Sequence, residues 1–256
     1  QTMLSWDSIS RLLSEVEAMQ LWERGALDLR SGARWYVPEF PDNGTANRVR
    51  HLLCHQGGLV HYTNGKEIRT KRDYPVAHPF ENVIYALDTF KESPLVNKPG
   101  EKYSYSTRGY MLVSAVVERA GKQKFAHQVR DRIAKPLKLA TLQPDYQWEE
   151  IPHRAVGYRQ RGGQVEVSTN TDVSWKLGGG GFISNIDDLA KFAAGLLNLS
   201  LIHFSDPTRP RLNSYAGFCF LTHIHNSGPT KLGRRSQAYF ISPLHTRLTS
   251  RRCNSP

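Results

Sequence analysis

Hydrophobic residues recur at helical spacing in three long segments of this 256-residue chain. In residues 8–23, 107–120 and 187–198, apolar side chains stand three and four positions apart, which is the spacing that gives a helix one buried face. The middle segment is apolar almost all round, so we expect its helix to be central and buried. Weaker patterns of the same kind predict three shorter helices, over residues 48–54, 79–90 and 122–136.

The rest of the chain up to residue 199 carries turn and strand signals. Residues 155–167 favour a β-hairpin that turns at Gly162 and Gly163. The polar stretch 62–79, with its basic cluster, is interpreted as an exposed excursion. Four consecutive glycines, 178–181, predict a tight entry into the 187–198 helix. A phosphate-binding loop is the alternative, but the glycines lack the Gly-Lys-Ser/Thr ending and a clear preceding strand.

The net charge of +11 raises the question of a nucleic-acid partner, and its distribution argues against one. Eight basic residues and a single acidic one fall within 200–256. A charge gathered at one Ser-, Arg- and Pro-rich end is typical of a solvated tail. We therefore divide the chain into a domain over 1–199 and a basic tail over 200–256, disordered or non-native. We predict no nucleic-acid partner. No run of about 18 apolar residues occurs, so no membrane span is predicted.

Histidine and cysteine positions bear on a metal site. The candidate ligands are His51, His55 and His61. The first two share a face of the predicted 48–54 helix, but no carboxylate follows at ligand spacing. The three cysteines show neither a CxxC pair nor a Cys/His ligand pattern. We expect these histidines to be packed or at the surface, and we predict no metal and no cofactor.

Ser8 and Arg11 are the first candidates for chemistry. They stand three residues apart in the first turn of a predicted helix, so their side chains share one face. A serine hydroxyl becomes a good nucleophile only when a base takes its proton, and arginine stays protonated in proteins. Taken alone, a serine at this position is more typical of a helix cap.

Four ordered segments change that interpretation. They are Ser8-Ile9-Ser10-Arg11 with the following 19–29, then 50–59, 98–110 and 175–197. In this order they resemble the S-x-x-K helix, the "arg-his-leu-leu-thr-his-thr-ser-gly-leu" segment, the "pro-gly … tyr-ser-asn-x-gly-tyr" segment and the "gly-gly-gly-phe-leu-ser" segment of serine β-lactamase-like and penicillin-binding-protein-like hydrolases. Mitochondrial members and their bacterial relatives show the greatest resemblance.

The resemblance implies a role for particular residues. Ser8 corresponds to the acylated nucleophile, and Tyr105 to the tyrosine that moves a proton between nucleophile and leaving group. Arg11 stands in place of the family's lysine, and Thr107 in place of its asparagine. Because an ordinary phenol has a pKa near 10, Tyr105 would need nearby positive charge to work as a phenolate. Arg11 could supply that charge but could not accept the serine proton.

A third family element, an edge strand with "lys-thr-gly" or "his-thr-gly", has a weak counterpart in His225-Asn226-Ser227-Gly228. His225 and Gly228 are therefore candidate substrate-binding residues, with a chance His and Gly in a loop as the alternative. In this fold, strands before the nucleophile helix and near the C-terminus build the sheet. Few residues precede Ser8 in this chain.

Together these observations predict an α/β (α+β) domain of the β-lactamase/transpeptidase-like type. It would consist mostly of the helical subdomain, with an incomplete antiparallel sheet, in a fragment with an aberrant C-terminal tail. The predicted function is a serine hydrolase that cleaves amide or ester bonds of a small-molecule or peptide substrate through an acyl-enzyme. The alternative is a non-catalytic homologue or fragment with a structural or assembly role. An oligomer is left open.

Overall fold

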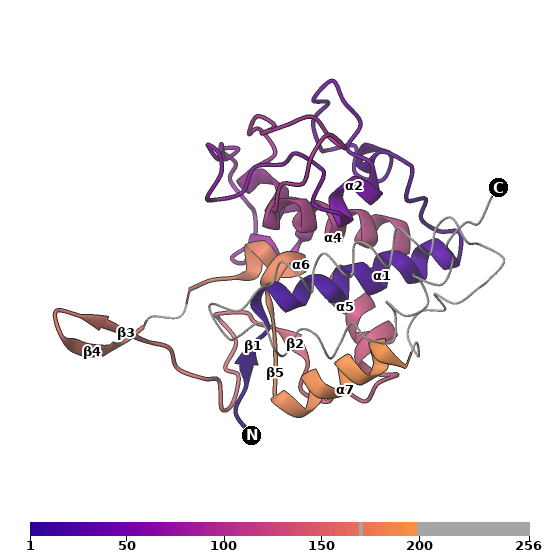
Figure 1. The fold of residues 1–256 in the computed structure, drawn as a ribbon. Coiled ribbons are helices and arrows are strands. Elements are labelled where there is room, and N and C mark those ends of the chain that lie inside the picture. Colours follow the sequence, from indigo (N-terminus) through magenta and orange to yellow (C-terminus); the bar gives the residue numbers. More distant parts are fainter. Residues whose placement is uncertain (169–170, 199–256) are drawn as a thin grey trace, which may run out of the picture. The chain divides into compact units, whose positions relative to one another are not determined.

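Two helices form the centre of the domain. The computed structural model describes residues 1–168 and 171–198, so the predicted 200–256 tail, with His225 and Gly228, lies outside the described part. Helix α1 spans Arg11–Glu23 and packs against α4, which spans Thr107–Gly121 (Figure 1). Every residue from Thr107 to Val117 is buried, which confirms the prediction of a central helix. The hydroxyl of Ser106, the N-cap of α4, accepts the N–H of Gly109 at 3.2 Å.

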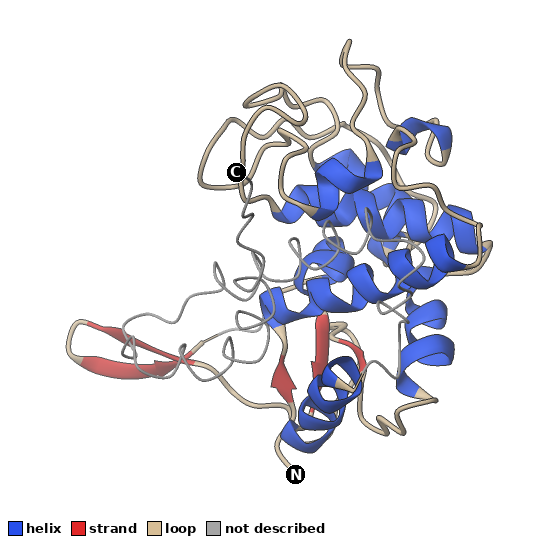
Figure 2. Cartoon of the chain, turned by 45° about the vertical axis from the view of Figure 1, so that its right-hand side comes forward, coloured by secondary structure: helices blue, strands red, loops and turns tan. Residues whose placement is uncertain are grey.

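A small antiparallel sheet lies beside these helices (Figure 2). Its strands β1 (Leu4–Ser5), β5 (Phe182–Ser184) and β2 (Gln143–Pro144) run in the order β1-β5-β2. The central strand β5 is fully buried and leads into α7 (Ile186–Leu197). Phe192 of α7 packs on Trp6 with ring centroids 5.3 Å apart. Helices and antiparallel strands in one core make this an α+β fold, as the sequence predicts.

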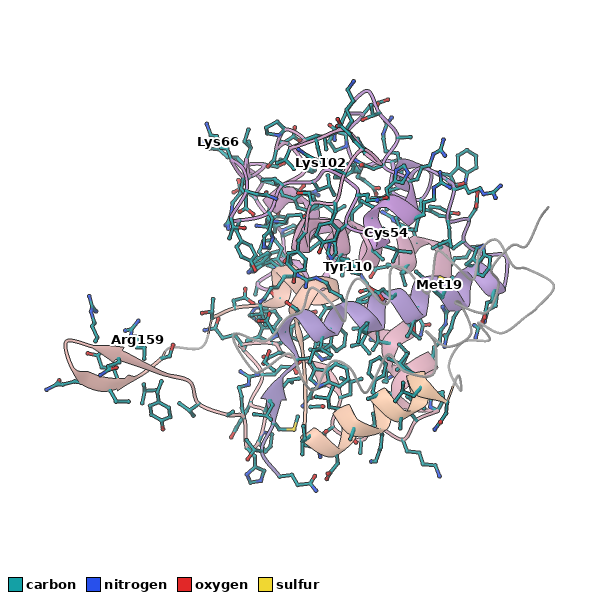
Figure 3. The ribbon with its side chains drawn as sticks, in the orientation of Figure 1. Met19, Cys54, Lys66, Lys102, Tyr110 and Arg159 are labelled. Carbon is teal, nitrogen blue, oxygen red and sulfur yellow. The ribbon has the colours of Figure 1, made fainter. Side chains whose placement is uncertain are left out.

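The predicted hairpin is confirmed. Strands β3 (Tyr158–Arg161) and β4 (Gln164–Val167) pair antiparallel around Gly162 and Gly163. Both glycines have positive φ, 57° and 83°, which is the backbone that a two-residue hairpin turn requires. Most side chains of the hairpin are exposed, including Arg159, labelled in Figure 3.

Helix α2 (Val49–Leu53) confirms the short helix predicted over 48–54, whereas the other two short helices differ from the sequence prediction. Residues 79–90 do not form one helix, because Asn82 has an extended backbone and its side chain accepts the N–H of Ile84 at 3.0 Å, so a new helix begins there. The 122–136 segment is an α-helical turn followed by a π-helical one. The observed short helices are η2 (Ala33–Trp35), α2 (Val49–Leu53), η3 (Pro79–Glu81), α3 (Val83–Ala86), η4 (Leu87–Thr89), α5 (Phe125–Val129) and η5 (Arg130–Ala134).

The glycine run also departs from its prediction. Glycines 178–180 belong to the short helix α6 (Leu177–Gly180), which follows the turn η6 (Ser174–Lys176), and strand β5 separates them from α7. Close packing against α4 explains the glycines. A Cβ on Gly178 would lie 2.4 Å from the Cβ of Ser114, and one on Gly179 would lie 2.7 Å from Cγ2 of Thr107. The run therefore allows α6 to approach α4 rather than forming a tight entry into α7.

Candidate active site

Ser8 and Tyr105 meet although 97 positions separate them in the chain. Ser8 lies in the 3-10 turn η1 (Asp7–Ser10), and Tyr105 lies on the extended segment before α4. Their hydroxyl oxygens are 3.1 Å apart, and both side chains are half-buried. The α-helix begins at Arg11, not at Ser8, and the residue at the N-cap of η1 is Trp6. The interpretation of Ser8 as a helix cap is therefore wrong.

Arg11 joins Tyr105, and through it Ser8, to Thr107. Its side chain is buried, 1% exposed, because the 3-10 turn places residues 8 and 11 on the same side as the Tyr105 segment. The guanidinium donates hydrogen bonds to Oη of Tyr105 and, at 2.8 Å, to Oγ1 of Thr107. Its Cζ atom lies 4.3 Å from the centroid of the Tyr105 ring. The four candidate residues before position 199 thus form one connected cluster.

Glu15 is a buried carboxyl beside this cluster that the sequence analysis missed. Burial raises its pKa from 4.5 to about 8, against smaller opposing effects of the Tyr110 hydrogen bond and of Arg11. The Tyr110 hydroxyl lies 2.5 Å from Oε1 of Glu15 and 2.7 Å from the carbonyl oxygen of Leu53. The Tyr110 hydroxyl has one hydrogen, so it can donate to only one of these two oxygens. If it donates to the Leu53 carbonyl, a protonated Glu15 donates the second hydrogen bond to the Tyr110 oxygen. Near neutral pH a neutral Glu15 therefore does not compensate the positive charge of Arg11. A carboxylate four positions after Arg11 was the available signal.

Asp7, directly before Ser8, has a backbone conformation that is unusual for a residue with a side chain. Its φ is 42°, in the left-handed region. Its carboxylate accepts a hydrogen bond from Nζ of Lys176 at 2.9 Å. This ion pair ties the turn that carries Ser8 to η6, just before the glycine-rich α6.

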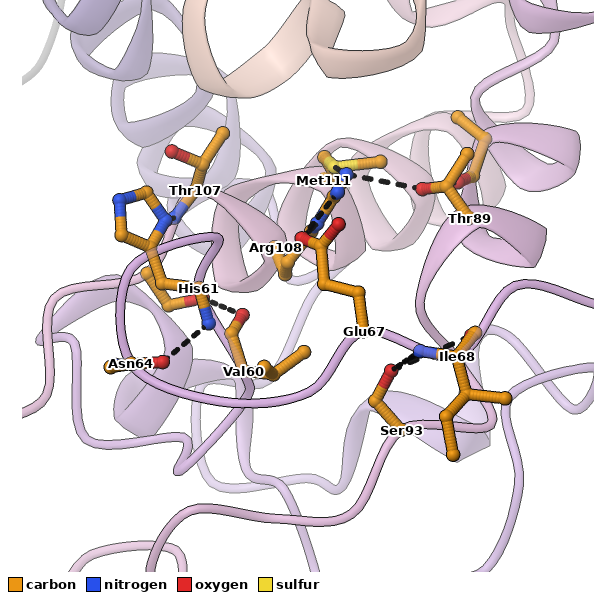
Figure 4. A network of polar contacts seen from close by, with 12 residues as sticks. Val60, His61, Asn64, Glu67, Ile68, Thr89, Ser93, Thr107, Arg108 and Met111 are labelled. Atoms are coloured by element: carbon orange, nitrogen blue, oxygen red, sulfur yellow. Dashed lines mark hydrogen bonds and ion pairs between the residues drawn. The ribbon is translucent and has the colours of Figure 1, made fainter.

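Arg108 anchors part of the 62–79 excursion to α4 (Figure 4). Its buried guanidinium donates to Oε1 of Glu67 from Nε at 2.7 Å and from Nη2 at 2.5 Å, and to Oγ1 of Thr89 at 3.1 Å. Its Cζ atom also lies 4.3 Å from the centroid of the Trp175 ring. The excursion is mostly exposed, as predicted, but the ion pair with Arg108 attaches Glu67 to α4 three residues after Tyr105.

Over 1–168 and 171–198, no three His, Cys, Asp or Glu side chains come together in a way that could hold a metal ion. In the same part of the chain, no helix combines the length and the apolar character that crossing a bilayer requires.

Comparison with known proteins shows the same architecture in solved structures. FmtA from Staphylococcus aureus superposes with a TM-score of 0.66 at 20% sequence identity, covering 78% of this chain and 54% of that one. A D-stereospecific amidohydrolase from Streptomyces sp. superposes with a TM-score of 0.66 at 23% identity, covering 78% of this chain and 62% of that one. The fold is thus of the β-lactamase/transpeptidase-like type.

The sequence defines the family. The beta-lactamase family model matches residues 5–220, so this chain belongs to the beta-lactamase family, which is one of serine hydrolases. The mitochondrial serine beta-lactamase-like protein LACTB of Homo sapiens is 29% identical over an alignment of 260 positions, gaps included, which covers 77% of this chain and 47% of that protein. The chain spans about half the length of the curated relatives it matches.

Proposed function

We propose that this chain is a serine hydrolase that opens an amide or ester bond of a small molecule or peptide through an acyl-enzyme on Ser8. The observation that carries the proposal is the 3.1 Å contact between the Ser8 and Tyr105 hydroxyl oxygens. A catalytic base must lie within hydrogen-bonding distance of the proton that it removes, and Tyr105 meets this condition.

Each group then has one task. Oγ of Ser8 attacks the carbonyl carbon of the substrate while its proton passes to the phenolate oxygen of Tyr105. The tetrahedral intermediate collapses, the bond to the leaving nitrogen or oxygen breaks, and Tyr105 returns the proton to that atom. Water then attacks the ester carbon while it gives a proton to the phenolate oxygen of Tyr105. The bond from that carbon to Oγ of Ser8 breaks, Tyr105 returns the proton to Oγ, and the acid is released. Arg11 stays protonated throughout, and its guanidinium stabilises negative charge on the Tyr105 oxygen.

Neighbouring groups support this assignment for Arg11. The guanidinium is held in place by Thr107 at 2.8 Å, so it needs little reorganisation when charge develops on Tyr105. Glu15 is neutral below its pKa of about 8 and therefore does not neutralise Arg11 near pH 7. The cation is thus available to the phenol oxygen.

A fluorophosphonate probe, which phosphonylates activated serines, tests the proposal. We expect covalent labelling of the folded chain and its loss in Ser8→Ala. The matched control is Ser5→Ala, an exposed serine in β1 three residues earlier, which should be labelled like the unaltered chain. Persistent labelling of Ser8→Ala would refute Ser8 as the nucleophile.

A second candidate function is a non-catalytic homologue with a structural or assembly role. The observation that favours it is the replacement of the expected lysine by Arg11, which cannot take a proton from Ser8. Under this alternative, well-folded protein shows no labelling by either a fluorophosphonate or a fluorescent penicillin, and Ser8→Ala changes nothing.

A further inference from the structure

Two backbone N–H groups at the start of α4 are bound by histidine rings. Ser106 donates its N–H to Nδ1 of His55 at 3.1 Å, and Thr107 donates its N–H to Nδ1 of His61 at 3.3 Å. The first N–H groups of a helix have no partner within it. Both rings are almost fully buried, with exposed fractions of 3% and 5%. Figure 4 shows His61 against Thr107.

These hydrogen bonds define the protonation of the rings. An imidazole nitrogen that accepts an N–H carries no proton, so in each neutral ring the proton is on Nε2. His61 remains in this neutral form near pH 7, because burial lowers its pKa from 6.5 to about 4, and the nearby Arg11 and Arg108 act in the same direction. The His61 ring therefore offers a permanent acceptor to the α4 backbone.

The same two histidine rings also pack against the ring of Tyr105. The His55 ring lies 4.6 Å from the Tyr105 ring, centroid to centroid, and the His61 ring meets it edge-on at 5.4 Å. The surrounding loop adds two ties to the segment that carries Tyr105. Ser104 donates its N–H to the carbonyl oxygen of His55 at 2.7 Å, and the Ser106 hydroxyl donates to that of Val60 at 2.9 Å. Tyr105 is thereby in contact with both histidine rings, and both of its neighbouring residues are hydrogen-bonded to the same loop.

We propose that His55 and His61 are positioning residues, which hold the Tyr105 oxygen within reach of Ser8 by binding the Ser106 and Thr107 backbone and packing on the phenol ring. This inference rests on the proposed function of Ser8 and Tyr105. Neither histidine exchanges a proton with the substrate. Their effect on the reaction is transmitted through Tyr105.

Paired substitutions test separately the two properties of each histidine, its hydrogen-bond acceptor Nδ1 and its aromatic ring. In His61→Asn the amide oxygen occupies the place of Nδ1 and accepts the Thr107 N–H, whereas His61→Phe keeps an aromatic ring without an acceptor. His55→Asn and His55→Phe form the second pair. His55 has a φ of 54°, and asparagine tolerates this left-handed backbone better than most residues.

For each variant, the affinity for a penicillin and the rate of covalent acylation are measured separately. We expect His61→Phe to lower the acylation rate at least about tenfold with little change in affinity, since misplacing a reacting group costs rate. His61→Asn should restore most of that loss. His127→Phe, an exposed position on α5, is the control and should acylate like the unaltered chain. Equal acylation by His61→Phe and the unaltered chain would overturn the inference.

Nitrogen NMR of the ¹⁵N-histidine-labelled chain supplies a readout that needs no activity. Near neutral pH, we expect both rings to show an unprotonated Nδ1 and a protonated Nε2. In a chain labelled instead with ¹³C-tyrosine, the Tyr105 ring signals should shift in His61→Phe and remain in place in His61→Asn. A proton on Nδ1 of either ring, or unchanged Tyr105 signals in both Phe variants, would contradict the positioning role. If no variant is acylated while the NMR result holds, the proposed function fails and the positioning of Tyr105 stands.

Discussion

The guanidinium of Arg11 lies over the ring of Tyr105 and donates a hydrogen bond to its phenol oxygen. A lysine at this position could lose its proton and serve as a base, but arginine cannot. The chemistry that we propose therefore depends on Tyr105 as proton acceptor and on Arg11 as its fixed cation.

Two substitutions of Arg11 should change the acylation rate in opposite directions, lysine raising it and methionine lowering it. Arg11→Lys introduces an amine that can accept the Ser8 proton, so we expect acylation by a fluorescent penicillin to become roughly tenfold faster or more. Arg11→Met keeps part of the unbranched side chain and removes the charge, and the rate should fall by about tenfold or more. Stopped-flow fluorescence measures both. A Met variant that reacts as fast as the unaltered chain would show that the cation is dispensable.

Substitutions of Tyr105 and Tyr110 should have different effects, the first on the acylation rate and the second on the free energy of unfolding. Tyr105→Phe removes the proton acceptor, so acylation should fall about a hundredfold or more. Tyr110→Phe instead takes a hydroxyl away from the buried Glu15 and the Leu53 carbonyl, and should lower the free energy of unfolding by about 1–3 kcal/mol. Urea unfolding and acylation of the folded protein measure the two effects. The assignment would fail if Tyr110→Phe lost acylation and Tyr105→Phe kept it.

Glu15 should make stability depend on pH. Its pKa is about 8 in the folded chain and 4.5 as the ordinary value, so the folded state binds more protons between these values. The stabilising contribution is complete below about pH 4.5 and is lost as pH rises through 8. Its size is of the order of a few kcal/mol. Urea unfolding at several pH values checks this, and Glu15→Gln should flatten the slope. An equal slope in both proteins would contradict the raised pKa.

The glycines of α6 should be needed for packing. In Gly178→Ala the new methyl group meets Ser114 at 2.4 Å, so we expect a loss of about 1–3 kcal/mol in the free energy of unfolding. Gly32→Ala is the control, because its φ is −66° and its new Cβ would meet only the Cβ of Ala46, at 3.9 Å. Thermal unfolding compares the two. An unaltered melting temperature in Gly178→Ala would mean that α6 and α4 are not in close contact.

The sequence predicted the elements whose signals are local. Amphipathic spacing identified α1, α4 and α7, and the Gly162-Gly163 turn identified the hairpin, because each pattern reports which side of a short segment is buried. The break at Asn82 was missed because a single capping side chain ended one helix and began another within an unbroken apolar pattern. The glycine run was misplaced because its cause, contact with α4, is a tertiary one.

For the candidate site, the resemblance to a family supplied Ser8, Arg11, Tyr105 and Thr107, and the structure brings these four together. No local pattern indicates that the pKa of the Glu15 carboxyl is raised, because the cause is the burial of this side chain in the folded protein. The candidates His225 and Gly228 lie outside the described residues and stay predictions.

Mass spectrometry of the penicillin-treated chain, followed by peptide mapping, tests the central claim most directly. The account predicts one acyl group per chain on the peptide that contains Ser8, at a rate that falls in Tyr105→Phe. An adduct on any other serine, or complete absence of an adduct on folded protein, would contradict it.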